Sequence, residues 1–246
     1  MIIRDRCPQC HSKQFKKNGH LPSGKQSHRC NDCGQQFVLD FEQRLVSDED
    51  RDLIKRLLCE RLSLQGICRA VGVGMKWLMG FVVQCYEAAP EDLNVRFPGC
   101  PKNVIFYRLT AEADELQSFV GKKKNKQWLW LAIDSHTRQA LAFHVGDRSK
   151  KSARKLWKKL PAVYRQHATF WTDGYTSYQG VIPAIQHRIV TKASRGTNHI
   201  ERLNCTLRQR VSRLVRATLS FSKKLTNHIG AIKYFLSQYN LELARA

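Results

Sequence analysis

Two C-x-x-C pairs lie within the first forty residues of this 246-residue chain. Cys7 and Cys10 form the first pair, Cys30 and Cys33 form the second, and nineteen mostly polar residues separate them. Each pair can direct two sulfurs at one centre, so together they can supply the four-thiolate shell of structural zinc. A segment this short and polar would scarcely fold without its metal. The sequence therefore predicts a zinc ribbon or finger over residues 1–42.

Two other interpretations of these cysteines stay open. The thiols could form a redox dithiol pair, or His11 or His28 could replace one cysteine as a zinc ligand. In a four-ligand zinc site the protein fills every position, so the metal is structural and leaves no open position for chemistry.

The segment from 43 to 88 has the pattern of short helices. Ser63 can cap one helix, Gly72-Val73-Gly74 makes a turn, and a further helix runs from about Met75 to Tyr86. Helix, glycine turn, helix is the pattern of a helix-turn-helix module, whose second helix enters the DNA major groove. Because Lys76 is the one basic residue of that second helix, a helical bundle without a role in DNA binding remains the alternative.

Residues 103–246 alternate between strand-like and helix-like patterns, and residues 89–102, with three prolines, indicate a linker before them. The predicted elements are strands at Val104–Asp114, Trp128–Asp134 and Gln139–Val145, a basic helix at Ser149–Leu160, strands at Ala168–Thr172 and His187–Lys192, and helices from about Glu201 and over Ser222–Leu243. Three strands in meander order, then a helix, two strands and helices, predict an α/β domain of the ribonuclease H-like class. The small zinc ribbon or finger and the all-α helix-turn-helix module precede it.

Three carboxylates fall where such a domain brings its acids to one end of the sheet. Asp114 lies on the first strand, Asp173 follows the buried run A-T-F-W-T at a D-G turn, and Glu201 begins a later helix. Displacement at a phosphodiester uses two metals, which activate the attacking oxygen and stabilise the leaving one. Mg²⁺ and Mn²⁺ prefer hard oxygen ligands such as these. We therefore predict Asp114, Asp173 and Glu201 as catalytic acids and as ligands of magnesium or manganese.

Each acid also has an ordinary structural explanation. Asp173 could merely open its turn, and Glu201 could merely stabilise a helix N-terminus. Glu112 or Glu115 could assist or replace Asp114. Asp134, in the run I-D-S-H-T-R, is interpreted as a hairpin-turn residue.

The charge balance indicates a polyanionic partner. Lys and Arg number 42 against 20 Asp and Glu, which gives a net charge of +22 and favours double-stranded DNA over a membrane surface. The residues that we expect to bind DNA are Lys122, Lys123, Lys124, Arg195, Arg202 and Arg208. Arg210, Arg213 and Arg216 are expected to continue this row along the Glu201 helix.

Targeting signals are not evident in the sequence. No run of eighteen apolar residues occurs, so we expect no membrane span. The N-terminal residues M-I-I-R-D-R-C-P lack the apolar core of a signal peptide. Nine cysteines at uneven spacing favour a reducing compartment, so a cytoplasmic location is expected.

Several motifs, taken in order, resemble those of the transposase of the insertion sequence one family. They are C-P-Q-C, C-N-D-C-G-Q-Q-F, G-I-C-R-A-V-G-V-G, A-E-A-D-E, W-L-W-L-A-I-D-S, W-T-D-G-Y-T-S-Y, H-I-E-R-L-N and L-S-F-S-K, and they cover the chain from Cys7 to about Tyr239. The resemblance implies a DDE-type transposase in which Asp114, Asp173 and Glu201 match the catalytic acids. It also implies a prokaryotic, nucleoid-associated protein.

The sequence thus predicts a DNA transposase that binds the terminal inverted repeats of its element. It would nick the DNA to free 3′-hydroxyl ends and join them to target DNA by two-metal transesterification. Because two ends must be held together, we expect a homo-oligomer, a dimer or larger. The alternatives are a non-catalytic zinc-finger and helix-turn-helix regulator, or a plain metal-dependent nuclease.

Overall fold

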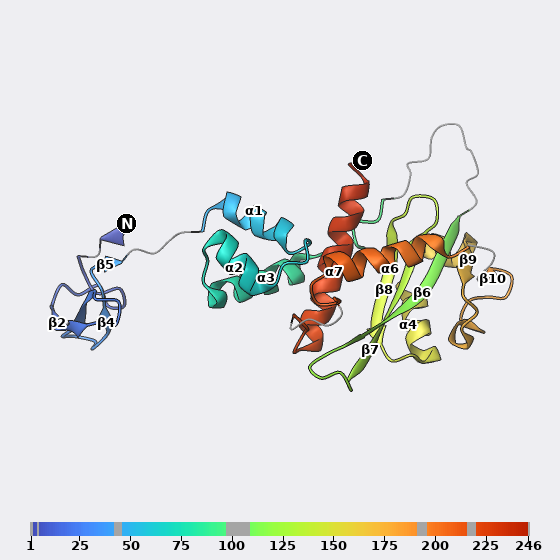
Figure 1. The fold of residues 1–246 in the computed structure, drawn as a ribbon. Helices are drawn as coiled ribbons and strands as arrows, with labels where there is room; N and C mark the ends of the chain where they lie inside the picture. Colours follow the sequence, from blue (N-terminus) through green and yellow to red (C-terminus); the bar gives the residue numbers. More distant parts are fainter. Residues whose placement is uncertain are drawn as a thin grey trace. The chain divides into compact units, whose positions relative to one another are not determined.

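The computed structural model describes residues 2–3, 5–41, 46–96, 109–190, 196–215 and 220–245 and is drawn in Figure 1. The chain forms two compact units, Met1–Asp48 and Glu49–Ala246. It is a mixed α/β protein with a cysteine cluster in the first unit and a sheet in the second, as the sequence predicts at this level.

The first unit consists of short antiparallel strands. β2 (Phe15–His20) and β3 (Gln26–Cys30) form a hairpin, and β4 (Gln36–Phe37) pairs with β3. A second pair joins β1 (Ile2–Ile3) to β5 (Asp40–Phe41). In the part of this unit that is described, the core cluster has three buried side chains, those of Cys7, Cys30 and Phe37. A core this small needs further stabilisation, such as a bound metal.

The second unit begins with three helices, α1 (Asp48–Leu57), α2 (Leu64–Val71) and α3 (Met75–Ala88). The predicted cap and turn are confirmed. The Ser63 hydroxyl accepts the Gly66 N–H at 3.0 Å, and Gly72 takes the left-handed conformation with φ 71°. No single described helix is long and apolar enough to cross a membrane, and α2 with α3 would pass that test only as a pair bent by 113°.

The sheet of the second unit has five strands in the order β10-β9-β6-β7-β8. β6 (Thr110–Phe119), β7 (Lys126–Asp134) and β8 (Ala140–Gly146) form the predicted antiparallel meander. β9 (Thr169–Thr172) is parallel to β6, and β10 (His187–Ile189) is parallel to β9. The start of the first predicted strand, from Val104, lies outside the described residues.

Helices cover both faces of the sheet. The basic helix α4 (Lys150–Lys159) packs Ala153 and Leu156 into one core cluster with Ala111 and Ala113 of β6. The short helix α5 (Ala162–His167), which the sequence pattern did not predict, and the 3₁₀ turn η1 (Thr176–Tyr178) contribute to the same cluster. The intervening β6 residues point to the opposite face, where α6 (Asn198–Arg210) lies against β6 and β7.

The last helix, α7 (Leu225–Leu243), joins the parts of the second unit. It packs against α3 and against β8. The Asn240 side chain accepts the N–H of Ala140 at 2.8 Å, and its amide donates to the carbonyl oxygens of Ala140 and Leu93 at 2.9 and 2.8 Å. One side chain of α7 therefore holds the start of β8 and the residues after α3.

His228 makes folding stability depend on pH. It is fully buried on α7, its two ring nitrogens lie 3.3 Å from the hydroxyls of Ser118 and Ser222, and burial, with the charge of Arg213, lowers its pKa to about 4. The unfolded pKa is near 6.5, so the stability that His228 contributes is complete above that pH and is lost as the pH falls towards 4. The loss amounts to about 3 kcal/mol.

We expect His228→Gln to remove this part of the pH dependence. Urea unfolding of the variant and of the native protein between pH 7 and pH 4 would show the stability difference between them shrinking as the pH falls. The control is His167→Gln at an exposed position of α5, where the difference should be constant. Parallel stability curves for native protein and His228→Gln would contradict the prediction.

Candidate active site and metal centre

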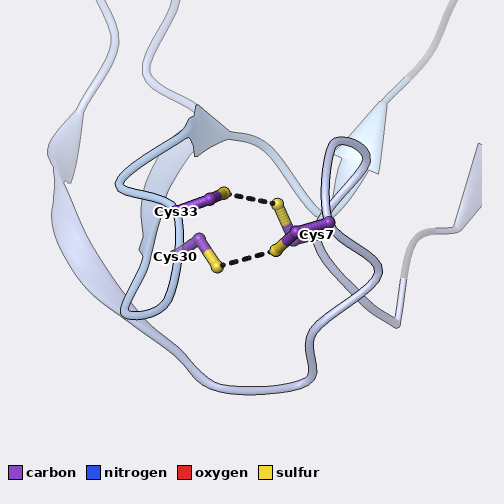
Figure 2. Close-up of side chains that lie close together, drawn as sticks. Cys7, Cys30 and Cys33 are labelled. Atoms are coloured by element: carbon purple, nitrogen blue, oxygen red, sulfur yellow. Dashed lines mark hydrogen bonds between the residues drawn. The ribbon is translucent and has the colours of Figure 1, made fainter.

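Four cysteine sulfurs converge in the first unit. All four lie within 4.8 Å of one another, with Cys7 and Cys33 at 3.5 Å and Cys10 and Cys30 at 3.5 Å. Figure 2 shows the sulfurs facing a common centre between the loop that holds Cys7 and the loop that follows β3. Cys7 and Cys30 are buried, whereas Cys10 and Cys33 are exposed.

The four thiols differ in acidity: the pKa values of Cys7 and Cys30 are lowered, whereas those of Cys10 and Cys33 are raised. Burial raises the pKa of the Cys7 thiol. Hydrogen bonds from the N–H groups of Cys10 and Gln9 and from the neighbouring thiols lower it by more, so the pKa falls to about 7. Four converging thiols with backbone N–H donors fit a tetrahedral ion such as zinc. Of the two histidines that could have replaced a cysteine, His28 packs against Phe15 and Phe37, and His11 is exposed.

Asp114 lies on β6, and Asp173 immediately follows β9, the parallel neighbour of β6. The pairing between these strands runs as far as Glu112 and Trp171, two residues before each acid. Asp173 is exposed, and its carboxylate accepts the N–H of Tyr175 at 3.0 Å, which closes the turn at Gly174 with φ 82°.

Glu201 reaches the same region from α6. Ile200, Leu203 and Leu207 are buried on the sheet side of this helix, whereas Glu201 is exposed and accepts only a hydrogen bond from Thr197 at 3.2 Å among the described contacts. After burial, the charges of Asp173 and Glu201 are among the contributions that raise the pKa of Asp114.

Asp114 is held in a partly buried, polar environment. The Asn204 side chain donates to it at 2.8 Å from one turn after Glu201. Burial, with the nearby carboxylates, raises its pKa to about 6. The side-chain oxygen of Asn204, Oδ1, is buried and has no hydrogen-bond partner among the described residues. Such an oxygen fits a hard cation or a water bound to one.

The three carboxylates are more widely spaced than the cysteines. Among the described residues, the cysteine cluster is the one group of three or more possible ligands whose atoms all lie within 4.8 Å of one another. The exposed acids Asp173 and Glu201 would therefore need to adjust their side chains to share an ion with Asp114.

Glu112 has a structural task on the same strand. It is buried, and its carboxylate accepts the first free N–H groups of α6, those of His199 and Ile200, both at 2.9 Å. This arrangement satisfies two donors of the helix N-terminus and favours a negative charge there. Glu112 therefore positions the helix that carries Glu201. Its partners, His199 and Ile200, lie 87 and 88 residues further along the chain, so no local sequence pattern indicates this role.

Substitution of Glu112 separates this role from that of Asp114. Because Gln keeps an oxygen but loses the charge, Glu112→Gln should lower the free energy of unfolding by about 1–2 kcal/mol. We expect the variant to keep measurable Mg²⁺-dependent DNA cleavage, whereas Asp114→Asn should have none. Urea unfolding and a cleavage assay would check both. A Glu112→Gln variant of native stability with no cleavage would place Glu112 among the metal ligands instead.

Glu115 points to the opposite face of the sheet and pairs with Arg148. The Arg148 guanidinium donates to the Glu115 carboxylate at 2.8 and 3.0 Å and lies 4.4 Å from the Trp128 ring centre and 4.1 Å from that of Tyr175. Because Tyr175 follows Asp173 by two residues and its hydroxyl donates to the Arg148 carbonyl at 2.9 Å, Arg148 helps to hold the Asp173 loop. Sequence reasoning did not identify this residue.

Asp134 is a structural residue of the hairpin between β7 and β8, as predicted. Its carboxylate accepts the N–H groups of His136 and Thr137 and the hydroxyl of Tyr164 at 2.7 Å. These bonds account for both carboxylate oxygens of this buried side chain.

The basic residues expected to bind DNA lie in different places. Lys122, Lys123 and Lys124 are exposed in the turn between β6 and β7. Arg202 is exposed beside Glu201, Arg208 is partly buried on α6, and Arg195 lies outside the described residues.

Of the arginines predicted to continue the row beyond Arg208, the structure describes Arg210 and Arg213. Arg210 pairs with Glu60 at 2.8 Å and with Glu242 at 2.9 Å, so it links α6 to the turn after α1 and to α7. α6 ends at Arg210, which leaves Arg213 in a turn, and Arg216 lies outside the described residues. The apolar spacing of Val211 and Leu214 continues the helical pattern, but the backbone does not.

Comparison with known proteins identifies relatives of the part of the chain that contains the five-stranded sheet. Residues 108–241 match the family described as IS1 transposase. The chain is 34% identical over 164 residues to the insertion element IS1 1 protein InsB of Escherichia coli (strain K12), which covers 66% of this chain and 92% of that protein. It is 35% identical over 131 residues to the insertion element iso-IS1n protein InsB of Shigella dysenteriae, covering 53% and 96%.

A solved structure also aligns with the chain, at low similarity. It is a chain of the simian T-cell lymphotropic virus intasome in complex with PP2A regulatory subunit B56 gamma, with a TM-score of 0.37 and 11% identity over 74% of this chain and 66% of that one. These values are too low to establish a shared fold.

Proposed function

Since this chain belongs to the IS1 transposase family, we propose that it is a metal-dependent DNA transposase of the DDE type. It binds the terminal inverted repeats of its element, nicks the DNA to free 3′-hydroxyl ends and joins these ends to target DNA. The observation that supports this proposal most is the course of the chain around Asp114: Asp114 lies on β6, Asp173 follows the parallel neighbour β9, and Glu201 lies on α6, which packs against β6.

We assign the sheet to the ribonuclease H-like class. The order β10-β9-β6-β7-β8, with an antiparallel meander followed by two parallel strands, supports this assignment. So does the placement of the acids, because parallel strands end at the same edge and α6 crosses the sheet beside them.

Asp114, Asp173 and Glu201 would hold the catalytic magnesium or manganese ions. When bound, such ions activate the attacking oxygen and stabilise the leaving oxygen of an in-line displacement. The chain itself contributes rigid placement of Asp114 on β6, an Asn204 hydrogen bond that orients its carboxylate, and a Glu112 anchor for α6. No covalent enzyme nucleophile is required, since water attacks first and a DNA 3′-hydroxyl attacks second.

DNA binding is assigned to the parts of the chain that precede the sheet and to basic residues near the acids. The cysteine cluster, as a zinc ribbon or finger over residues 1–42, and α2–α3, as a helix-turn-helix over residues 43–88, would bind the element ends. The 113° bend between α2 and α3 supports the second assignment. Lys122, Lys123, Lys124, Arg195, Arg202 and Arg208 would contact phosphates. Holding two ends together implies a homo-oligomer.

The test is incubation of the purified chain with DNA that carries the flanking inverted repeat, with Mg²⁺ and a target plasmid. We expect nicked ends and, with precleaved ends, joined products that depend on the 3′-hydroxyl. A 3′-deoxy end is the matched control and should not be joined. Products that consist solely of hydrolysed fragments would indicate a plain nuclease, and specific binding without any cleavage would indicate a DNA-binding regulator.

A further inference from the structure

The exposed face of α4 consists entirely of basic residues. Its apolar side packs into the core through Ala153, Leu156 and Trp157. The six remaining long side chains are all exposed, and α4 contains no acidic residue. They are Lys150, Lys151, Arg154, Lys155, Lys158 and Lys159.

These six side chains form two parallel rows along the helix. Lys150, Arg154 and Lys158 follow one another at four-residue steps, and so do Lys151, Lys155 and Lys159. Residues four apart on an α-helix lie on the same side, about 6 Å apart along the axis. The basic residues therefore cover the half of α4 that faces away from the sheet.

This arrangement works against the stability of α4. Each like-charge pair at a four-residue step destabilises a helix by about 0.2–0.5 kcal/mol. Lysines in the first turn, such as Lys150 and Lys151, also oppose the helix dipole. Within the described residues none of the six forms an ion pair, and Lys159 alone has a recorded aromatic contact, 5.2 Å from the Phe143 ring centre.

Gln or Glu would fit the exposed face of α4 as well as Lys does, yet this face keeps its unfavourable positive charge. Such a face is suited to a polyanion that neutralises the charge. The face differs from the DNA-binding residues already proposed, because α4 covers the side of the sheet opposite α6. The first basic residue of α4, Lys150, follows the N-cap Ser149 and lies two residues after Arg148, which contacts Tyr175 of the Asp173 loop.

We propose that the two basic rows of α4 bind the phosphate backbone of a DNA duplex, independently of its sequence. Lysine and arginine rows on an exposed helix reach phosphates but carry no donor and acceptor pattern that would select a base. The proposal depends on the transposase function only for the choice of DNA as the polyanion, and its test requires no cleavage.

The test compares the native chain with Lys151→Gln/Lys155→Gln/Lys158→Gln in binding to a duplex of random sequence, without added Mg²⁺ or Mn²⁺. We expect affinity for the random duplex at low salt to fall at least about tenfold, and the dependence of log K on log salt to lose about 2–3 units of slope, which corresponds to three phosphate contacts. The preference for inverted-repeat DNA over random DNA should not change.

Two variants control for charge and for folding. The variant Lys223→Gln/Lys224→Gln/Arg245→Gln removes the same charge from exposed positions just before and just after α7. It should leave the slope of log K against log salt nearly unchanged. The α4 triple variant should melt about 2–4 °C higher than the native chain, because three like-charge pairs are removed. Lys155→Glu, which creates favourable pairs with Lys151 and Lys159, should also fold and bind the duplex more weakly.

Equal affinity and slope for the native chain and both folded α4 variants would overturn the proposal. An equal loss in the α7 control would overturn it too, since the effect would then reflect net charge alone. Phosphatidylserine vesicles provide the last comparison. Binding to vesicles that depends on the α4 rows, without such dependence for DNA, would assign the surface to a membrane.

Discussion

Asp173→Asn and Glu201→Gln are each expected to reduce Mg²⁺- or Mn²⁺-dependent cleavage of element-end DNA at least about 1000-fold. Each substitution removes a charged oxygen ligand but keeps the shape of the side chain. Both residues are exposed and make few contacts, so the free energy of unfolding should change by less than about 0.5 kcal/mol. Binding to end DNA should persist, as a gel-shift assay would show.

The control for these variants is Asp52→Asn, which removes an exposed carboxylate of α1 that forms an ion pair with Lys55 at 2.8 Å. It should cleave like the native protein. Undiminished cleavage by Asp173→Asn or Glu201→Gln would remove that residue from the active site. Loss of both binding and cleavage would instead show that the variant fails before the chemical step.

Cys30→Ser is expected to abolish zinc binding and to unfold the first unit. The described core of that unit is the buried cluster of Cys7, Cys30 and Phe37, so the metal must supply much of the folding free energy, on the order of 10 kcal/mol for structural zinc sites. Metal analysis should find no zinc, and limited proteolysis should degrade residues before Asp48 while the second unit stays intact.

Cys205→Ser is the matched control, because Cys205 is an exposed thiol of α6 outside the cluster. It should keep one zinc per chain and a protected first unit. Stoichiometric zinc in Cys30→Ser would refute the four-thiolate site and favour a histidine ligand. Zinc-free native protein that is fully folded would favour the redox interpretation of the cysteines.

The predictions that succeeded depend on short-range physics. Ser63 and Gly72 delimit α2 as expected, because capping and a left-handed turn involve only the adjacent residues. Alternation along β6 separates the faces of Glu112 and Asp114 from that of Glu115, as two-residue periodicity requires.

The parts that the sequence did not reveal depend on distant partners. Nothing near Glu112 indicates that it caps a helix 87 residues later, and nothing near Arg148 indicates its place between Trp128 and Tyr175. The sequence also does not show that α6 ends at Arg210, because Val211 and Leu214 keep the helical spacing, whereas the partners of Arg210, Glu60 and Glu242, are distant in the chain. Long-range ion pairs of this kind produce no periodic pattern in the sequence from which they could be predicted.

Gly230 allows α7 to approach α3 closely, since a side-chain carbon at this position would lie 2.7 Å from the Tyr86 ring. The helix proposed to read DNA is thereby packed against the helix that also carries the start of β8 through Asn240. In the proposed function, α3 would bind the element end from a fixed position relative to the sheet that carries Asp114. The number of base pairs between the sequence that α3 reads and the bond that is cut would be set by the protein, and inserting or deleting base pairs there should move the cut relative to the element end.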